Sequence, residues 1–294
     1  MKSKIMLKGY LFVIASAVLY GLMPLMAKTI YQSGVNSFTL VFLRNALSLP
    51  ALAFLALSQQ KTLRISKKSL PTIAIAALFG CCATPALLYC SYNFIDSGTA
   101  TVFHFIYPAM VVVGSILFLK QKPGIGVLLS VLVCVAGICM FYDPAQPLNW
   151  QGALLALLSG VTFAVYVLIL TVFKDRKSTG FLFSFYAALI SAIVMLIFCV
   201  ATGNLCLPQT LKGWILSIVF ALLINACATV MFQQGTFLVG GQRSSILSTM
   251  EPITSIVVDA AVFSVAVNLR IGIGAALVVA ATVMIALFDS HKAK

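Results

Sequence analysis

Long apolar runs, separated by short polar segments, follow one another along the whole chain. Each run holds about 18 to 22 residues, enough for an α-helix to cross a hydrocarbon core of about 30 Å. We place ten such helices at residues 9–27, 38–57, 72–92, 99–119, 124–142, 151–173, 180–200, 214–235, 244–263 and 271–288. The pattern therefore predicts an all-α integral membrane protein with ten transmembrane helices.

The positive residues support this number of helices, because short cytoplasmic loops are enriched in Lys and Arg. With the N-terminus inside, fifteen of the 19 positive residues fall in cytoplasmic segments, and only Lys28, Lys212 and Arg270 fall outside. One helix more or fewer would destroy this alternation in every later loop. We therefore predict that both termini are cytoplasmic, and that the first apolar run is a retained helix rather than a cleaved signal peptide.

Composition agrees with a membrane protein and argues against other classes. Hydrophobic residues make up 62% of the chain and charged residues 9%, whereas about a quarter of a soluble protein is charged. The net charge of +13 follows from the loops and favours contact with anionic lipid rather than with nucleic acid. The cysteines and two histidines have no metal-ligand spacing, and no phosphate-binding loop is present. We expect no cofactor, no metal and no enzyme activity.

The two halves of the chain resemble each other. Residues 95–116 run through Tyr107-Pro108, and residues 239–260 run through Glu251-Pro252 in the same place. We predict one membrane domain, 1–294, built from five-helix repeats at 1–145 and 150–294. Because five is odd, the second repeat enters the membrane from the opposite side. Inverted repeats around one site can open it to each side in turn, which is alternating access.

Several short motifs occur in the order and spacing of a known family. They are Leu19-Tyr20-Gly21 with Pro24, Phe42-Leu43-Arg44, the segment 99–108, Gln242-Arg243-Ser244-Ser245-Ile246, and Glu251-Pro252. On these residues the whole chain resembles the drug/metabolite transporter superfamily, in particular its ten-helix, EamA-type carriers. The resemblance implies a small organic solute such as an amino acid, nucleoside, sugar or drug, often exported and often driven by protons.

One family feature is missing. A Gly-Glu pair commonly ends the fourth and ninth helices of such carriers, but here those places read Lys120-Gln121-Lys122 and Val265-Ala266-Val267. A coupling role for that acid therefore does not carry over to this chain.

Glu251 is the leading candidate for a functional residue because it lies in the middle of an apolar run. A carboxylate at that depth costs several kcal/mol and usually serves a solute or proton pathway. Pro252 and Pro108 each remove a helical hydrogen bond, which frees the carbonyls of Ser248 and His104. Broken helices at membrane depth line cavities in many transporters, so we expect both prolines to mark helix breaks at the site.

Other polar residues complete the predicted pathway. His104 either exchanges a proton near neutral pH or serves as a structural donor, and the hydroxyl of Tyr107 needs a partner near mid-membrane. Ser248 and Ser255 share a helix stripe with Asp259, and this stripe fits either a pathway or a close helix interface. The remaining candidates for cavity residues come from the matching of the two repeats: Tyr20, Tyr166, Tyr89 and Gln233.

Arg44 lies about 10 Å into the second helix from the outer surface, and Asp259 lies about as deep. We predict first that the two form a buried ion pair. Arg44 has two alternatives, which are to reach outward to the interface or to bind a substrate carboxylate directly.

Together these features predict a secondary active transporter of a small organic solute in a bacterial-type inner membrane, with export and proton coupling as expectations. Two alternatives are an uncoupled facilitative exchanger and a membrane interaction protein that does not transport. The sequence leaves monomer and homodimer equally open.

Overall fold

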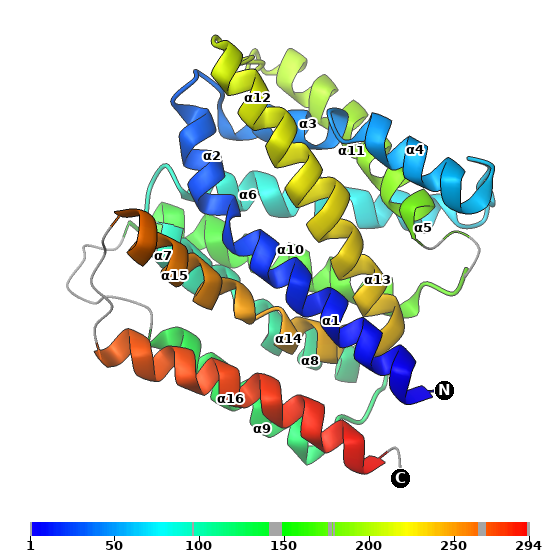
Figure 1. The fold of residues 1–294 in the computed structure, drawn as a ribbon, viewed down its shortest axis with the longest axis vertical. Helices are drawn as coiled ribbons and strands as arrows, with labels where there is room; N and C mark the ends of the chain where they lie inside the picture. Colours follow the sequence, from blue (N-terminus) through cyan, green and yellow to red (C-terminus); the bar gives the residue numbers. More distant parts are fainter. Residues whose placement is uncertain are drawn as a thin grey trace.

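The computed structural model describes residues 2–95, 97–140, 149–175, 178, 180–263 and 269–292. Within them the regular structure is helical and forms one bundle (Figure 1). The first half contains α1 (Lys2–Gly21), α2 (Met23–Tyr31), α3 (Ser37–Ala46), α4 (Leu49–Gln60), α5 (Leu70–Ala76), η1 (Ala77–Ala83), α6 (Thr84–Ser91), α7 (Ser97–His104), α8 (Tyr107–Leu117) and α9 (Ile125–Cys139). The second half contains α10 (Trp150–Val172), α11 (Phe181–Ala201), α12 (Leu211–Phe220), η3 (Ala221–Thr229), α13 (Val230–Val239), α14 (Gly241–Leu247), α15 (Met250–Phe263) and α16 (Leu269–Lys292).

Joined across their breaks, these segments make the ten helices that the apolar runs predict. Seven helices are each long and apolar enough to cross a membrane, in the part of the chain that the structure describes. Of the others, α9 is shorter, with 15 residues, and α14 and α15 are two pieces of one broken helix. Phe54, Phe118 and Ile125 are 69%, 77% and 76% exposed, which suits side chains that face lipid rather than water.

Proline accounts for four of the helix breaks. Pro24, Pro50, Pro108 and Pro252 each lie within the first three positions of the segment that follows a break, namely α2, α4, α8 and α15. A proline has no N–H to donate to the preceding turn, and its ring crowds that turn. Placed at the start of a new segment, it loses nothing, because the N–H groups there have no helical partner in any case.

The third helix of each half contains a π-helix at the same place. These are η1 and η3, in which the backbone is wider than in an α-helix. Thr84 directly follows η1, and Thr229 is the last residue of η3. Thr84 Oγ1 donates to the carbonyl of Phe79 at 2.8 Å, and Thr229 Oγ1 donates to that of Ile224 at 2.9 Å, both across five residues. π-Helices are rare and frequently occur at functional sites, so their repetition directs attention to the centre of the bundle.

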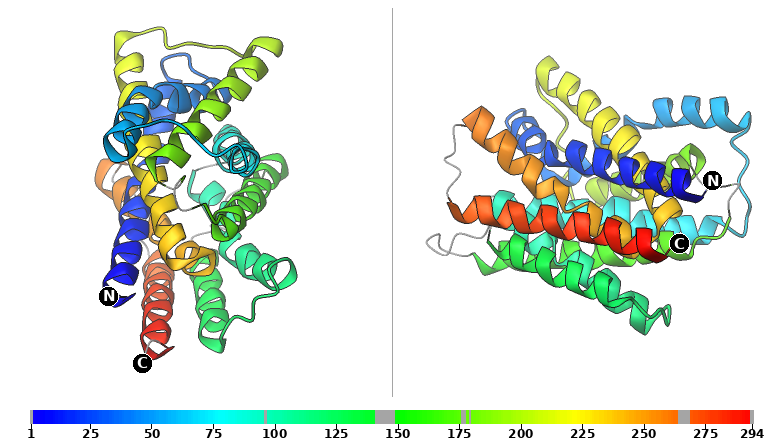
Figure 2. Two further views of the ribbon diagram at one scale, coloured as in Figure 1. Left: turned by 90° about the vertical axis from the view of Figure 1, so that its right-hand side faces the viewer. Right: turned by 60° about the horizontal axis from the view of Figure 1, so that its bottom comes forward.

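The two halves interlock instead of packing as separate units. Helix α1 packs against η3, α13 and α15 of the second half, while α10 packs against η1, α6, α7 and α8 of the first. Helix α3 packs against α11, and α9 lies beside α16 at one edge of the bundle (Figures 1 and 2). The beginning of α1 and the end of α16 lie at the same end of the bundle (Figure 1). That end is the one we predict to be cytoplasmic.

Candidate functional site

A small cavity lies where helices of both halves meet, and five of the predicted site residues border it. Its polar border consists of Tyr20, Arg44, Thr84, Tyr89, His104 and Glu251, and its apolar border of Met23, Gly80, Pro85, Leu88 and Phe163. The volume is ≈ 40 Å³, enough for a few water molecules. Sites for small organic ligands measure about 300 Å³ or more, so the cavity has no room for such a solute in this structure.

Glu251 reaches this cavity from the break between α14 and α15. Pro252 cannot donate to the carbonyl of Ser248, and the N–H of Glu251 takes its place at 2.9 Å. Ser248 itself donates to the carbonyl of Ser244 at 2.5 Å, and its role in a solute pathway stays a prediction. The Glu251 side chain is partly buried, and within the described residues its carboxylate forms no hydrogen bond and no ion pair.

Arg44 enters the same cavity from α3 and is surrounded by neutral partners. The side chain is only 4% exposed. Nη1 donates to the Tyr89 hydroxyl at 2.9 Å, and Nη2 donates to Asn225 Oδ1 at 3.2 Å and Thr229 Oγ1 at 3.3 Å. Nε has no acceptor. An unpaired buried charge costs several kcal/mol, so this guanidinium is well placed to receive an anion.

The predicted pairing of Arg44 with Asp259 lies outside the described residues, because the side chain of Asp259 is not among those that the structure describes. It therefore stays a prediction. Asp259 follows Glu251 by eight positions on α15, which corresponds to about 12 Å along a helix axis.

Two tyrosines connect the cavity to the rest of the bundle. Tyr20 shares a hydrogen bond of 2.8 Å with Thr229 at the end of η3, and Tyr89 donates to Met23 Sδ at 3.2 Å. Asn225, which binds Arg44, also donates to Ser48 Oγ at 2.7 Å. The polar network therefore links α1, α3 and α6 of the first half to η3 of the second.

His104 occupies the wall of the cavity at the end of α7. Its Nδ1 lies 2.8 Å from Ser159 Oγ, and that hydroxyl donates to the carbonyl of Ala156 at 2.6 Å. A hydroxyl has one hydrogen, so Ser159 donates it either to that carbonyl or to Nδ1, and in the first case His104 itself carries the Nδ1 proton. The carbonyl of His104, which Pro108 deprives of its helical partner, faces Gly160 so closely that a Cβ there would lie 2.5 Å from the oxygen.

Four other predicted residues do not border the cavity. Gln233 Nε2 donates to the Tyr166 hydroxyl at 2.8 Å, and Gln233 also accepts a hydrogen bond from Ser184. Tyr107 packs its ring against Phe163, with ring centroids 4.7 Å apart, and its hydroxyl has no partner among the residues that the structure describes. Ser255 donates to the carbonyl of Gly21 at 3.0 Å, a contact between α15 and α1. Their roles in a solute pathway stay predictions.

Sequence reasoning missed several residues of the site. Met23 and Phe163 are ordinary apolar residues, and no sequence signal separates them from lipid-facing neighbours. Thr229 and Thr84 had a usable signal, because they occupy matching places in the two halves. The bonds of Asn225 to Arg44 and Ser48 required the fold, since these residues are far apart in the sequence.

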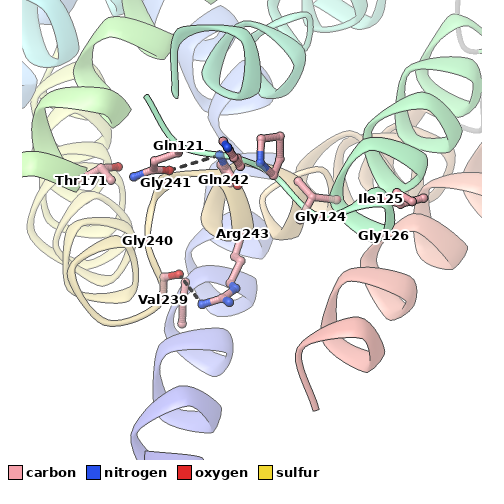
Figure 3. A pocket seen from close by; sticks show the side chains of 13 residues that line it. Gln121, Gly124, Ile125, Gly126, Thr171, Val239, Gly240, Gly241, Gln242 and Arg243 are labelled. Carbon is pink, nitrogen blue, oxygen red and sulfur yellow. Dashed lines mark hydrogen bonds between the residues drawn. The ribbon is translucent and has the colours of Figure 1, made fainter. Parts of the chain in front are cut away.

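A larger hollow lies at one end of the bundle, about 15 Å from Glu251 along the helix axis. It measures ≈ 370 Å³ and lies between residues 121–127 and 239–243. Figure 3 shows Gln242 bonded to Gln121 across it, with Arg243 turned back toward Val239. It lies between the connection that leads into α9 and the connection between α13 and α14, and it contains none of the predicted site residues.

Two groups of hydrogen bonds also join the halves at the two ends of the bundle. We call the first group latch A: Asn36 Nδ2 and Thr39 Oγ1 donate to the carbonyl of Asn204 at 2.7 and 2.8 Å, and the N–H of Cys206 donates to Thr39 Oγ1 at 2.9 Å. We call the second latch B: Ser69 Oγ donates to Asp175 Oδ2 at 2.5 Å, and the Tyr186 hydroxyl to the carbonyl of Leu63 at 2.7 Å. Each latch joins a loop of one half to the other half.

Known proteins resemble this chain in sequence, and a solved structure resembles it in fold. The chain is 24% identical over 301 residues to the uncharacterised inner membrane transporter YicL of Salmonella typhimurium, covering 98% of each chain. It is 23% identical over 210 residues to an uncharacterised transporter of Clostridium kluyveri, covering 68% of this chain and 67% of the relative. A solved crystal structure matches with a TM-score of 0.78 at 17% identity, over 97% of this chain and 99% of the other. The model of the EamA-like transporter family matches twice, at residues 7–142 and 150–287, and the chain therefore belongs to that family.

Proposed function

We propose that this protein is a secondary active transporter of a small organic solute, such as an amino acid, nucleoside, other metabolite or drug, and that Glu251 exchanges the coupling proton. The observation that carries the proposal is a carboxylate that borders the small central cavity without a hydrogen-bond or ionic partner among the described residues. Such a group is stabilised either by a proton or by a bound cation. It can therefore respond to both a proton gradient and a ligand.

Alternating access is supported by the two groups of hydrogen bonds that join the halves at the two ends of the bundle. Latch A and latch B each join the two halves, and opening one while the other stays closed would expose the cavity to one side only. The two halves carry equivalent π-helices and breaks, so they can exchange conformations. The transported solute would then cross without a continuous pore.

Location and direction complete the proposal. The relative YicL is described as an inner membrane transporter, and we propose the inner membrane for this chain. We propose export as the direction of net flux, an expectation that rests on the family resemblance. The alternatives are an uncoupled facilitative exchanger and a membrane interaction protein that transports nothing.

Counterflow in proteoliposomes tests this proposal. Labelled amino acids, nucleosides and cationic drugs are offered to wild type, Glu251→Gln and Glu251→Asp at several pH values. Wild type is expected to show saturable exchange with a pH dependence, and to accumulate solute when a proton gradient is imposed. Because glutamine cannot ionise, Glu251→Gln keeps exchange at high solute concentration but loses its pH dependence and the accumulation, whereas Glu251→Asp keeps both.

The contrary results separate the alternatives. A pH dependence unchanged in Glu251→Gln would remove Glu251 from proton coupling. Wild-type exchange that no proton gradient drives would support the facilitative exchanger. If folded wild-type protein exchanged no solute of the panel, the interaction protein would become the better description.

A further inference from the structure

We infer that Cys199 and Cys206 form a disulfide bond on the outer side of the membrane, and that this bond stabilises the loop that supplies latch A. The inference rests on the proposed inner membrane location and on the predicted topology, but not on transport or on any solute. In this structure both cysteines are free, which is the reduced form of the pair.

The end of α11 turns the chain back toward the first of the two cysteines. Cys199 lies in the last turn of α11, and the chain reverses at Gly203, where φ is +67°. The N–H of Asn204 donates to the carbonyl of Cys199 at 2.8 Å, and the N–H of Gly203 donates to that of Val200 at 3.2 Å. These two bonds form a Schellman motif, in which glycine reverses the chain at a helix end. The segment after Gly203 therefore returns toward Cys199.

The side chain of Thr39, in the first turn of α3, brings both cysteines to one place. The N–H of Cys206 donates to Thr39 Oγ1 at 2.9 Å, and the thiol of Cys199 contacts the Thr39 side chain and interacts with Cys206. Cys206 Sγ also accepts a hydrogen bond from Asn36 Nδ2 at 3.3 Å. A disulfide requires Cα atoms within about 7 Å of each other, and we expect the shared contact with Thr39 to keep the two residues in this range.

The position of the pair in the bundle determines its redox environment. The connection between α11 and α12 lies at the end of the bundle opposite to both chain termini (Figures 1 and 2). With the termini cytoplasmic, as the positive residues predict, this connection lies on the outer side of the membrane. Disulfides form and persist in the bacterial periplasm, whereas the cytoplasm keeps thiols reduced. The pair is therefore placed in an oxidising compartment.

The two cysteines differ in exposure, and this difference gives the order of the reaction. Cys206 is partly exposed, whereas Cys199 is fully buried. The Cys206 thiolate attacks a protein disulfide of the compartment, forms a mixed disulfide and releases one thiol of that oxidant. The Cys199 thiolate then attacks the Cys206 sulfur and releases the second thiol. Two electrons pass from the cysteines to the oxidant disulfide, and the two cysteine protons end on its two thiols.

The bond closes a short ring around the acceptor of latch A. Asn204 lies between the two cysteines, and its carbonyl accepts from Asn36 and Thr39 of the other half. A cross-link restricts the conformations that the enclosed segment can reach when its hydrogen bonds break. Because both cysteines belong to the second half, the disulfide stabilises the loop without joining the halves covalently. Latch A can therefore still open.

Cys90 is the competing partner for Cys206. Its thiol contacts Ser37, which directly follows Asn36 in the chain. Cys90 lies on α6, which packs against α3 in the first half, so a bond between Cys90 and Cys206 would tie the two halves together. We expect Cys90→Ser to leave the bond between Cys199 and Cys206 intact.

The experiment identifies the bond by mass spectrometry of the full-length protein from cell membranes. Cells are quenched with acid, free thiols are blocked with N-ethylmaleimide in denaturant, and trypsin then releases residues 178–212, which contain Cys199 and Cys206 and no other cysteine. We expect this fragment to be unmodified, to be lighter than the dithiol by two hydrogen atoms, and to accept two alkyl groups only after reduction. The fragments that contain the other cysteines are the internal control, because their thiols should react in the first step.

Single and double variants separate the bond from its effect. In Cys199→Ser the Cys206 thiol stays free, and a membrane-impermeant maleimide is expected to label it from the outer face. Reduction of the wild-type protein is expected to make hydrogen exchange severalfold faster in residues 202–207. The double variant Cys199→Ser with Cys206→Ser should exchange at the faster rate with or without reductant.

Four results would overturn the inference. The first is full alkylation of the wild-type fragment before reduction, and the second is a bond from Cys206 to Cys90. The third is labelling of Cys206 in Cys199→Ser from the cytoplasmic face alone, because the pair would then lie in a reducing compartment. The fourth is hydrogen exchange that reduction leaves unchanged, because the bond would then not stabilise the loop of latch A. The transport proposal stands or falls separately, by counterflow.

Discussion

Glycine determines how closely the helices approach at the centre of the bundle. A Cβ added to Gly80 of η1 would lie 2.3 Å from Cδ2 of Tyr166 and 2.4 Å from its Cγ. The ring of Tyr166 is itself held by Gln233 through its hydroxyl. Gly80 is therefore required by packing against the other half, at the border of the cavity.

Gly80→Ala is expected to destabilise the protein by about 1–3 kcal/mol, the usual cost of an added methyl group in a close-packed site. The measurement is the thermal unfolding midpoint of purified protein. Gly272→Ala on α16 is the matched control, because nothing lies within 4 Å of its Cβ position, and it should unfold as wild type does. Equal midpoints for Gly80→Ala and wild type would mean that Tyr166 moves aside without cost.

At the level of single residues, the sequence identifies polar side chains in the site but not apolar ones. Glu251, Arg44 and His104 stand out because ionisable groups are rare inside membrane helices. Met23 and Phe163 border the same cavity, yet any helix in a membrane contains such residues. Only the three-dimensional packing shows which apolar side chains face the cavity and which face lipid.

At the level of helices, the sequence predicts the features that depend only on residues close together in the chain. The apolar runs predict all ten helices, because crossing a bilayer requires a continuous apolar helix. Their ends lie within about four residues of those observed, except that the first helix begins at Lys2 instead of residue 9. The predicted breaks at Pro108 and Pro252 follow from the missing N–H of proline. No comparable sequence signal predicts the π-helices, since η3 contains no proline and consists of residues common in any α-helix.

The latches give an element-scale test of alternating access. Thr39→Val keeps the shape of the side chain but removes two bonds of latch A, those to the carbonyl of Asn204 and from the N–H of Cys206. Each bond contributes about 1 kcal/mol, so opening at this end should increase roughly tenfold or more. Hydrogen exchange is expected to become faster in residues 204–209 and slower around Ser69 and Asp175.

The reciprocal change is the decisive part of that measurement. Ser69→Ala removes a bond of latch B and should produce the mirror image, with faster exchange near Asp175 and slower exchange near Cys206. If each variant loosened only its own end, the two latches would be independent and the halves would not alternate.

At the level of the whole molecule, membership of a transporter family makes the chain a membrane transporter and not an enzyme. The whole-chain arrangement was also the least predictable part from the sequence. The matching of Tyr20 with Tyr166 indicated two halves, but not that the first helix of each half packs on the π-helix of the other. Such contacts between distant segments depend on the packing of the complete bundle.

The short helix α9 connects the protein to the thickness of its membrane. Its 15 residues span about 22 Å, against a hydrocarbon core of about 30 Å. It lies beside α16 at the edge of the bundle (Figure 1), where lipid must thin locally or the helix pair must shift to cover the difference. Counterflow is therefore expected to be faster in phosphatidylcholines with short monounsaturated chains than in those with long ones. Equal rates across the series would show that α9 meets no mismatch, whereas a steep dependence would make bilayer composition a regulator of the carrier.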